Sequence, residues 1–373
     1  MDIHSLLTPE RVNEATAWLY RQRQHYPDNA DIWDFRRQKD QQLASLQAQL
    51  QSGEYRFSPM QLVNKRDGSQ VAIWSSRDAL VIKLLSLALA EVLPCHPTCV
   101  HIKGHGGGKQ SVDKLDRLLQ GGQYHFVCRT DIQGYYANIQ KLPLLEQLAS
   151  YVRCPIMMNL LSQFLHYCVE SGGIFHTPKK GIPRACSLSP LLAGFQLYTV
   201  DKALSDWCKK TGGHYVRFMD DFVILTRSRW QLRAAVRKLN AFFAQHGFRQ
   251  HPDKTFIGRV AKGFDWLGYQ LNENGLCGVA PRALSYFAAK CRQCYAQALS
   301  QGLSESQASE KVAAYGRRWQ QWCCAGVTLR PVSLAECCPV GLTNIFAFVF
   351  SICGGPAGRT LKAKKLKRLK VKP

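Results

Sequence analysis

The spacing of hydrophobic positions predicts a chain rich in helices. The clearest pattern lies in residues 230–246, where apolar side chains recur three and four positions apart, as on one face of an α-helix. A helix start is marked by Thr8-Pro9, because Thr caps the first turn and Pro suits its first position. Similar patterns predict further helices over residues 9–26, 31–50, 78–93, 110–119, 142–152, 160–169, 191–209 and 281–322.

Shorter apolar runs between turn residues predict β-strands. Residues 125–130 form one such run, and two runs within residues 214–227 meet at Asp220-Asp221. Residues 55–74 predict a hairpin that turns at Asp67-Gly68, and residues 264–271 predict a single strand. Because strands and helices are mixed without regular alternation, the pattern favours an α+β fold.

The composition adds a strong positive charge. The 373 residues include 49 Lys+Arg against 26 Asp+Glu, which gives a formal net charge of +23 and a pI near 9.6. Such an excess is typical of proteins that bind a polyanion, and nucleic acid is the commonest. A chain of this length predicts two or three subdomains.

No segment predicts export or membrane insertion. Residues 1–10 lack a basic-then-apolar leader, and the longest apolar run, residues 340–353, is shorter than the roughly 20 residues that span a bilayer. We therefore expect a cytoplasmic protein with no membrane partner. The 15 cysteines are an odd count, so we expect reduced thiols that act as small buried side chains. Structural zinc is the alternative for the groupings at residues 95–101, 291–294, 323–324 and 337–338.

Three aspartates stand where the chain is otherwise apolar. Asp131 follows one predicted strand, and Asp220 and Asp221 occupy the tip of a predicted hairpin. An acid between segments that favour burial is costly unless it is paired or binds a cation. Three acids on neighbouring strand ends would form the oxygen-rich site that Mg²⁺ prefers. A solvated turn is the alternative for the Asp220-Asp221 pair taken alone.

The order of the motifs is more specific than any one of them. They are residues 50–59, the segment from Lys65 to Asp78, DIQGYY at 131–136, GIPRACSLSPLL at 181–192, FMDD at 218–221, HPDKT at 251–255 and FDWLGY at 264–269. In this order they resemble the bacterial, group II intron-like reverse transcriptases, with Phe in place of Tyr in the Y-x-D-D box. The resemblance spans about residues 50–270.

The resemblance implies a right-hand polymerase fold. Residues 1–120 would form N-terminal helices and fingers, 121–272 a palm with an antiparallel sheet, 273–330 a helical thumb, and 331–373 a Cys-rich segment with a basic tail. The implied activity is RNA-directed DNA synthesis, in which dNTPs are added to the 3′-hydroxyl of a DNA or RNA primer on an RNA template. Two Mg²⁺ ions would serve as cofactors.

The resemblance also implies roles for site residues. Asp131, Asp220 and Asp221 would bind the two ions, and the backbone carbonyl of Ile132 would help to hold the nucleotide-bound ion. Tyr136 would crowd a ribose 2′-hydroxyl and so favour deoxynucleotides; the alternative is an aromatic core residue.

Further roles concern the triphosphate and the primer. Lys254 would stabilise the triphosphate or protonate pyrophosphate, and a solvated lysine is the alternative. Trp266 and Gly268 would brace the primer end; taken alone, their segment predicts a buried strand. The basic residues Arg317 and Arg318 would bind duplex phosphates from the thumb, unless they lie on a merely solvated helix face.

Two departures from the family pattern concern positive charge. The fingers arginine that usually grips the triphosphate is absent, because Ser69-Gln70-Val71 stands there. Pro183-Arg184-Ala185 replaces the usual Pro-Gln-Gly. We expect Arg184 or Arg66, near Lys65, to supply the missing charge, since guanidinium suits phosphate oxygens.

The glycine-rich loop 104–109 does not match a phosphate-binding loop, because Lys103 and Gln110 occupy positions that need Gly and Ser or Thr. We expect the loop, with Lys109, to contact nucleic acid. The Lys/Arg-rich residues 359–372 predict a tail that orders on RNA or DNA.

Three other functions stay open: an RNA-templated RNA polymerase, a non-catalytic nucleic-acid-binding module, and a maturase or RNA-folding cofactor. Because little sequence follows the expected thumb, we favour an enzyme of phage defence that works with a structured non-coding RNA. Retron-like DNA synthesis and a degenerate mobile element are the alternative biological roles.

Overall fold

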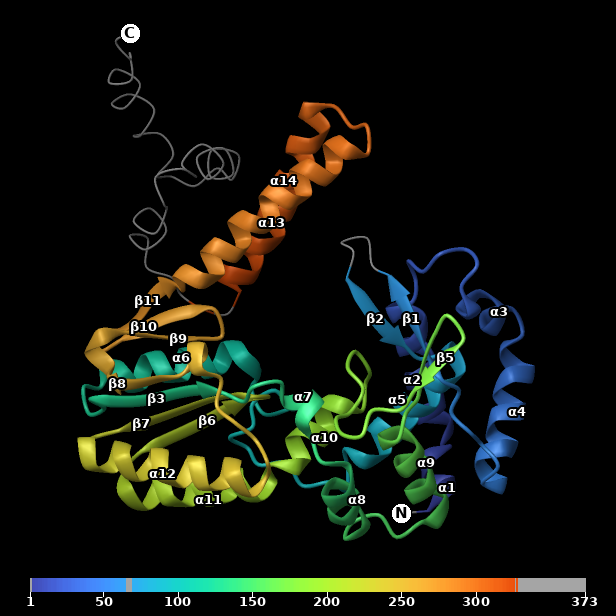
Figure 1. Ribbon diagram of the computed structural model, residues 1–373, viewed down its shortest axis with the longest axis horizontal. Helices are drawn as coiled ribbons and strands as arrows, with labels where there is room; N and C mark the ends of the chain where they lie inside the picture. The colour runs from blue at the N-terminus through green and yellow to red at the C-terminus, as the bar shows by residue number, and fades with distance from the viewer. Residues whose placement is uncertain (1, 65–68, 326, 328–373) are drawn as a thin grey trace. The chain divides into compact units, whose positions relative to one another are not determined.

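The computed structural model describes residues 2–64, 69–325 and 327. The chain divides into two compact units, which are treated separately below. The first contains residues 1–107 and 130–256, and the second contains residues 108–129 and 257–373. Helices and strands are mixed in both, which confirms the α+β prediction (Figure 1). Within the described residues, no helix is long and apolar enough to cross a membrane. The expected division into fingers, palm and thumb stays a prediction.

A layer of helices opens the first unit. These helices are α1 (Ile3–Leu6), α2 (Pro9–Gln22), α3 (Asp31–Arg37), α4 (Lys39–Ser52) and α5 (Ser76–Leu89). Thr8 caps α2 with its side chain, as expected. Most of the apolar side chains of α5 are buried, so this helix forms the centre of the layer. The prediction of one helix over residues 31–50 was wrong, because the helix is interrupted at Gln38.

A four-stranded sheet follows, with the order β2-β1-β4-β5. Its strands are β1 (Met60–Asn64), β2 (Gln70–Ile73), β4 (Val169–Ser171) and β5 (Ile174–His176). The antiparallel pairing of β1 with β2 confirms the predicted hairpin, whose turn at Asp67-Gly68 lies outside the described residues. The helix expected over residues 160–169 is α9 (Pro155–Leu165), and Val169 instead begins a strand that turns at Gly172-Gly173.

A second sheet has the order β6-β7-β3-β8. Its strands are β3 (Phe126–Asp131), β6 (His214–Phe218), β7 (Asp221–Thr226) and β8 (Phe256–Arg259). β6 and β7 form the predicted hairpin, and α11 (Tyr198–Thr211) and α12 (Arg229–Gln245) cover one of its faces (Figure 1). The long helix expected over residues 191–209 breaks at Leu197, so α10 (Ser189–Gln196) precedes α11. Three further elements lie in the first unit: α7 (Tyr135–Asn138), α8 (Lys141–Ala149) and η1 (Pro252–Lys254).

The second unit combines α6 (Gly107–Gln120), η2 (Val260–Lys262), a three-stranded sheet and two helices. The sheet has the order β11-β10-β9, from β9 (Phe264–Trp266), β10 (Tyr269–Asn272) and β11 (Gly275–Val279). The single strand expected over residues 264–271 was wrong: Leu267 and Gly268 both have positive φ and turn the chain back. The basic region expected to be helical forms α13 (Pro281–Ser300) and α14 (Glu305–Cys324).

Candidate active site

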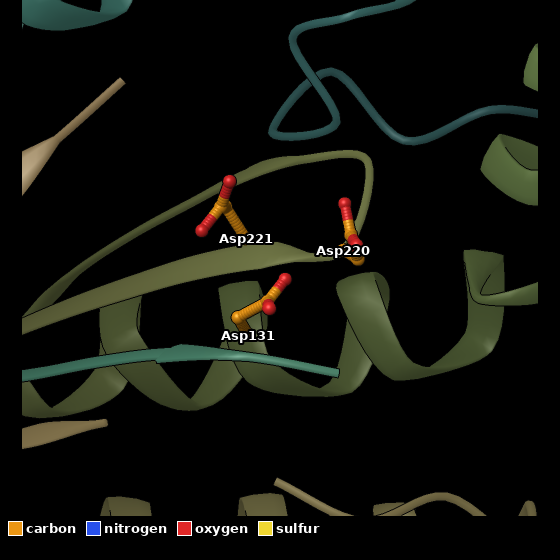
Figure 2. Close-up of side chains that lie close together, drawn as sticks. All are labelled: Asp131, Asp220 and Asp221. Carbon is orange, nitrogen blue, oxygen red and sulfur yellow. The ribbon is translucent and has the colours of Figure 1, made fainter. Parts of the chain in front are cut away.

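The first unit brings the three predicted aspartates together. Asp131 is the last residue of β3, Asp220 lies in the turn after β6, and Asp221 begins β7. One carboxylate oxygen from each lies within 4.8 Å of the others. Figure 2 shows Asp131 beside the hairpin turn that carries the other two. Residues about 90 positions apart in the sequence therefore form one acidic site.

Backbone hydrogen bonds fix this arrangement. The Ile132 N–H donates to the Asp220 carbonyl at 3.0 Å, and the His251 N–H donates to the Asp131 carbonyl at 2.8 Å. Both bonds hold the end of β3 beside segments that come later in the chain. Ile132 is fully buried beside the acidic site, and the role implied for its backbone carbonyl stays a prediction.

The electrostatics of the site fit a bound cation. Asp131 is 2% exposed, and its Oδ1 finds no hydrogen-bond partner among the described residues. Burial and the neighbouring Asp131 carboxylate raise the pKa of Asp220 to about 7. A divalent cation would relieve the repulsion between these groups, and carboxylate oxygens are the ligands that Mg²⁺ prefers. The donor set therefore suits the Mg²⁺ that the sequence implied.

Lys254 lies at the same site. Its Nζ is 2.6 Å from Asp131 Oδ2, and its side chain is about one third exposed. Next to it, the hydroxyl groups of Thr130 and Thr255 lie 2.7 Å apart, which ties η1 to the end of β3. The ammonium group can thus reach both the acidic site and an anion bound beside it.

A cavity of about 500 Å³ opens beside the aspartates, within the size range of small-molecule sites. Residues from four separate segments line it: Asp131, Ile132, Gly134, Tyr135, Tyr136, Arg184, Ala185, Cys186, Ser189, Pro190, Met219, Asp220, His251 and Lys254. The acidic site forms one wall and the 184–190 segment another. The cavity therefore brings together six predicted site residues, Asp131, Ile132, Tyr136, Arg184, Asp220 and Lys254, whereas Asp221 is not among its lining residues.

The two adjacent tyrosines differ in environment. Tyr135 is fully buried and donates a hydrogen bond to the Ala193 carbonyl at 2.8 Å, so it is a core residue. Tyr136 is only partly buried, and its hydroxyl lies 3.7 Å from Met219 Sδ. Burial raises the pKa of Tyr136, so the phenol stays neutral. Its ring is placed to contact a ligand in the cavity.

The loop with Arg184 is held against the Tyr136 segment. The Gly181 N–H donates to Ile139 O at 2.8 Å, and the Ile182 N–H donates to Tyr136 O at 2.9 Å. Arg184 itself is exposed at the cavity edge. Ala185 has φ +56°, a left-handed conformation that favours glycine. This explains why a Gly would suit the position that Ala185 occupies. Lys65 and Arg66 lie outside the described residues.

The predicted nucleic-acid contacts of the second unit differ in accessibility. Trp266 is fully buried, and its Nε1–H donates to Ser111 Oγ at 3.0 Å, so direct contact with a primer does not fit this geometry. Gly268 has φ +87°, and a Cβ there would lie 2.9 Å from the Trp322 ring. Gly268 is therefore required by packing.

Lys109 also makes contacts inside the second unit. Its Nζ lies 4.5 Å from the centre of the Tyr269 ring and 4.3 Å from that of Trp322, which is the geometry of cation–π contacts. By contrast, Arg317 and Arg318 are exposed on α14 and available to phosphates. Of the twelve cysteines in the described residues, five are buried, six are half-buried and Cys324 is exposed, so the expectation of buried thiols holds only in part.

Comparison with known families decides the identity of this site. The family model described as reverse transcriptase (RNA-dependent DNA polymerase) matches residues 75–271, which is more than half of the chain. The chain belongs to the reverse transcriptase family. The matched residues include all three aspartates, so the acidic site lies within the reverse transcriptase domain.

Individual relatives are distant. A putative COX1/OXI3 intron 1 protein of Saccharomyces cerevisiae is 24% identical over 174 residues, and the match covers 44% of this chain but 20% of that protein. The chain therefore spans about one fifth of this relative.

Two solved structures show weak likeness to the chain. A partial Cas6-RT-Cas1–Cas2 complex has 21% identity and a TM-score of 0.39, over 65% of this chain and 42% of that one. An apo telomerase of Candida tropicalis has 14% identity and a TM-score of 0.38, over 54% and 44%.

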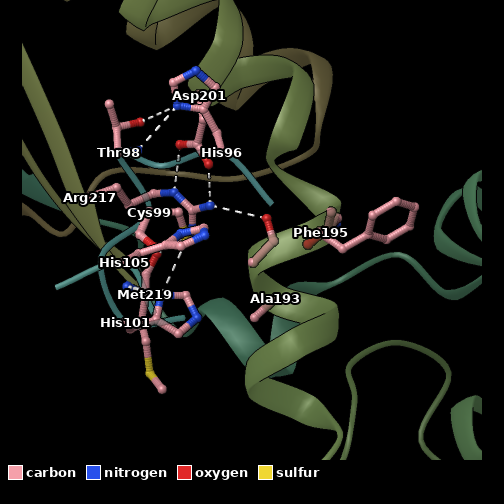
Figure 3. Close-up of polar contacts among 12 residues, drawn as sticks. His96, Thr98, Cys99, His101, His105, Ala193, Phe195, Asp201, Arg217 and Met219 are labelled. Atoms are coloured by element: carbon pink, nitrogen blue, oxygen red, sulfur yellow. Dashed lines mark hydrogen bonds and ion pairs between the residues drawn. The ribbon is translucent and has the colours of Figure 1, made fainter. Parts of the chain in front are cut away.

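The reverse transcriptase domain also contains residues that sequence reasoning missed. His101, Asp201 and Arg217 form a polar network beside Met219, with Asp201 and Arg217 fully buried (Figure 3). A signal was present, because Arg217 interrupts the apolar strand before the aspartates and an unpaired charge there would be costly. Its partners could not be identified, since they come from other parts of the chain.

Proposed function

We propose that this protein is an RNA-directed DNA polymerase that adds deoxynucleotides to a primer 3′-hydroxyl with two Mg²⁺ ions. The observation that carries the proposal is the acidic site: three carboxylates within 4.8 Å beside a cavity of about 500 Å³. Membership of the reverse transcriptase family supports the same reaction. The net charge of +23 supports a nucleic-acid substrate.

The residues of the cavity would have different roles in catalysis. Asp131, Asp220 and Asp221, with the Ile132 carbonyl, would hold the ions. Bound there, the ions would activate the primer hydroxyl and stabilise the leaving pyrophosphate. Lys254 would face the triphosphate, where its ammonium group can offset developing negative charge or donate a proton.

Primer extension tests this proposal directly. Purified protein with Mg²⁺, an RNA template, a DNA primer and dNTPs should extend the primer, and ribonucleotides should support much less synthesis. Efficient extension with ribonucleotides and little with dNTPs would favour the rival function, an RNA-templated RNA polymerase. Binding without any synthesis would favour a non-catalytic RNA-binding protein.

Tyr136→Ala tests the proposed sugar discrimination. The substitution should raise incorporation of ribonucleotides relative to deoxynucleotides, because it removes the ring that would crowd a 2′-hydroxyl. The ratio of kcat/KM for the two substrates measures this effect. Tyr136→Phe keeps the ring and should retain the wild-type ratio. An unchanged ratio in Tyr136→Ala would assign the ring to packing alone.

Arg184→Gln tests the source of positive charge at the cavity edge. We expect a raised KM for dNTPs, equivalent to about 1.5–3 kcal/mol for one lost charge-assisted hydrogen bond. Arg184→Lys should recover part of the loss, because it restores charge without the guanidinium fork. A variant that binds primer–template more weakly while KM stays unchanged would instead place Arg184 on nucleic acid.

The remaining parts of the chain would hold nucleic acid. We propose fingers within residues 1–120, a palm within 121–272 and a thumb within 273–330, with Arg317 and Arg318 against duplex phosphates. We also propose a structured non-coding RNA as partner and a role in phage defence. Sequencing RNA that co-purifies with the protein tests the partner: one enriched, structured RNA is expected, and a sample of bulk cellular RNA would contradict it.

A further inference from the structure

The turn that carries Asp220 has a strained backbone. Met219 has φ +52°, a left-handed conformation that non-glycine residues rarely adopt. Such strain persists only where surrounding contacts enforce it. Because Asp220 follows directly, the Met219 peptide determines where that carboxylate points.

Two side chains hold the peptide groups of Met219. Arg217 Nη1–H donates to the Met219 carbonyl at 2.7 Å, and the Met219 N–H donates to His101 Nδ1 at 3.0 Å. Figure 3 shows the arginine and the histidine beside this residue. The N–H and the carbonyl of one strained residue are thus both bound by side chains.

Arg217 is held in turn by a buried carboxylate. Both Arg217 and Asp201 are fully buried, with Nε–Oδ1 at 2.7 Å and Nη2–Oδ2 at 2.5 Å. The Tyr215 hydroxyl donates to the same Asp201 Oδ1 at 2.6 Å, and Arg217 Nη2 also donates to Gly194 O at 3.2 Å. A buried ion pair is weak evidence for stability, because desolvation offsets its attraction. The hydrogen bond from Arg217 to the Met219 carbonyl indicates that the pair also positions the turn.

His101 connects the turn to the cavity wall. A backbone bridge between Cys99 and Arg217 brings this histidine beside Met219. Since Nδ1 accepts from Met219, Nε2 carries the proton and donates to the Pro190 carbonyl at 3.0 Å. Burial lowers the pKa of His101 to about 4, which keeps this neutral form at physiological pH. Pro190 lines the cavity in the segment that follows Arg184.

We propose that His101 and Arg217 are positioning residues: they hold the Met219 peptide in its left-handed conformation and so set the Asp220 carboxylate against Asp131. Neither side chain is among the residues that line the cavity. Both act through the turn, with Asp201 orienting the arginine. The effect that we expect these residues to have on DNA synthesis rests on the proposed polymerase function. The effect that we expect on cation binding does not.

Variants of His101 test the proposal, because loss of Arg217 would leave the Asp201 carboxylate buried without its counter-charge and is expected to unfold the protein. His101→Asn places an amide oxygen near the position of Nδ1 and can still accept from Met219. His101→Gln places its amide near the position of Nε2 and can still donate to Pro190. His101→Ala loses both contacts.

Two measurements are made on each folded variant: Mn²⁺ binding by electron paramagnetic resonance, with Mn²⁺ alone as the probe, and single-turnover primer extension. We expect His101→Ala and His101→Gln to weaken Mn²⁺ binding and to slow extension by about 10–100-fold, as for outer-shell partners of other metal sites. His101→Asn should stay close to wild type. If no variant, including wild type, extends a primer, the proposed function fails, and Mn²⁺ binding still tests the positioning role.

A matched control separates positioning from stability. Ser228→Ala removes the side-chain cap of α12, which accepts from the Gln231 N–H at 3.3 Å, in the same unit and just past the end of β7 opposite Asp221. It should lower Tm without changing Mn²⁺ binding or extension. His101→Ala behaving like this control would overturn the proposal, and so would a His101→Asn variant as impaired as His101→Ala.

Discussion

Asp220→Asn is expected to slow nucleotide addition by several orders of magnitude while leaving nucleic-acid affinity nearly intact. Asparagine keeps the size of the side chain but removes the charge that would hold a cation against Asp131. The proposed reaction depends on cations that stabilise charge in the transition state, so the loss should fall on the chemical step. Single-turnover primer extension measures that step, and a filter-binding titration measures affinity. Asp131→Asn should behave in the same way.

The control for these variants is Asp206→Asn. Asp206 is exposed on α11, so its neutralisation changes the net charge equally but does not alter the acidic site. Its extension rate should match that of the wild type. Wild-type rates in both Asp131→Asn and Asp220→Asn would show that these carboxylates are not the catalytic ligands.

The affinity for a primer–template duplex should depend steeply on salt. With a net charge of +23, we expect the protein to neutralise several phosphates and release their counterions. For about 6–10 phosphate contacts, affinity should fall by about 10³–10⁵ between 50 and 200 mM salt. Fluorescence anisotropy of a labelled duplex over this salt range measures the slope.

Two changes identify where the contacts lie. Arg317→Gln with Arg318→Gln should lower the slope of log affinity against log salt by about two, because each phosphate contact contributes about one. Removal of residues 359–373, which include six lysines and two arginines, should also flatten it. Neither change should alter KM for dNTPs. A wild-type slope in both variants would place the contacts elsewhere.

The sequence could predict those elements that are encoded by residues adjacent in the chain. The apolar runs around Asp220-Asp221 predicted the β6–β7 hairpin, because strand pairing and a polar turn are encoded in adjacent residues. Thr8-Pro9 predicted the start of α2 for the same reason. The joint order of motifs predicted that Asp131 would meet the hairpin, which spacing alone could not establish.

Features that depend on distant contacts were missed or wrong. His101 and Met219 are 118 positions apart, so no periodicity links them. The break at Leu197 and the turn at Leu267-Gly268 fall inside segments whose patterns predict one continuous element, and tertiary packing decides where such segments bend. The hydrogen bond from the Trp266 ring to Ser111 of α6 also joins distant positions, and the role of Trp266 at the primer end stays a prediction.

The most direct test of the central claim is the position of the cations. Crystals of the protein with a chain-terminated primer on an RNA template, an incoming dNTP and Mn²⁺ would reveal the ions by anomalous scattering. We predict two peaks beside the carboxylates of Asp131 and Asp220, one of them also within reach of the Ile132 carbonyl and the triphosphate. Ordered nucleotide with no anomalous peak at these aspartates would contradict the account.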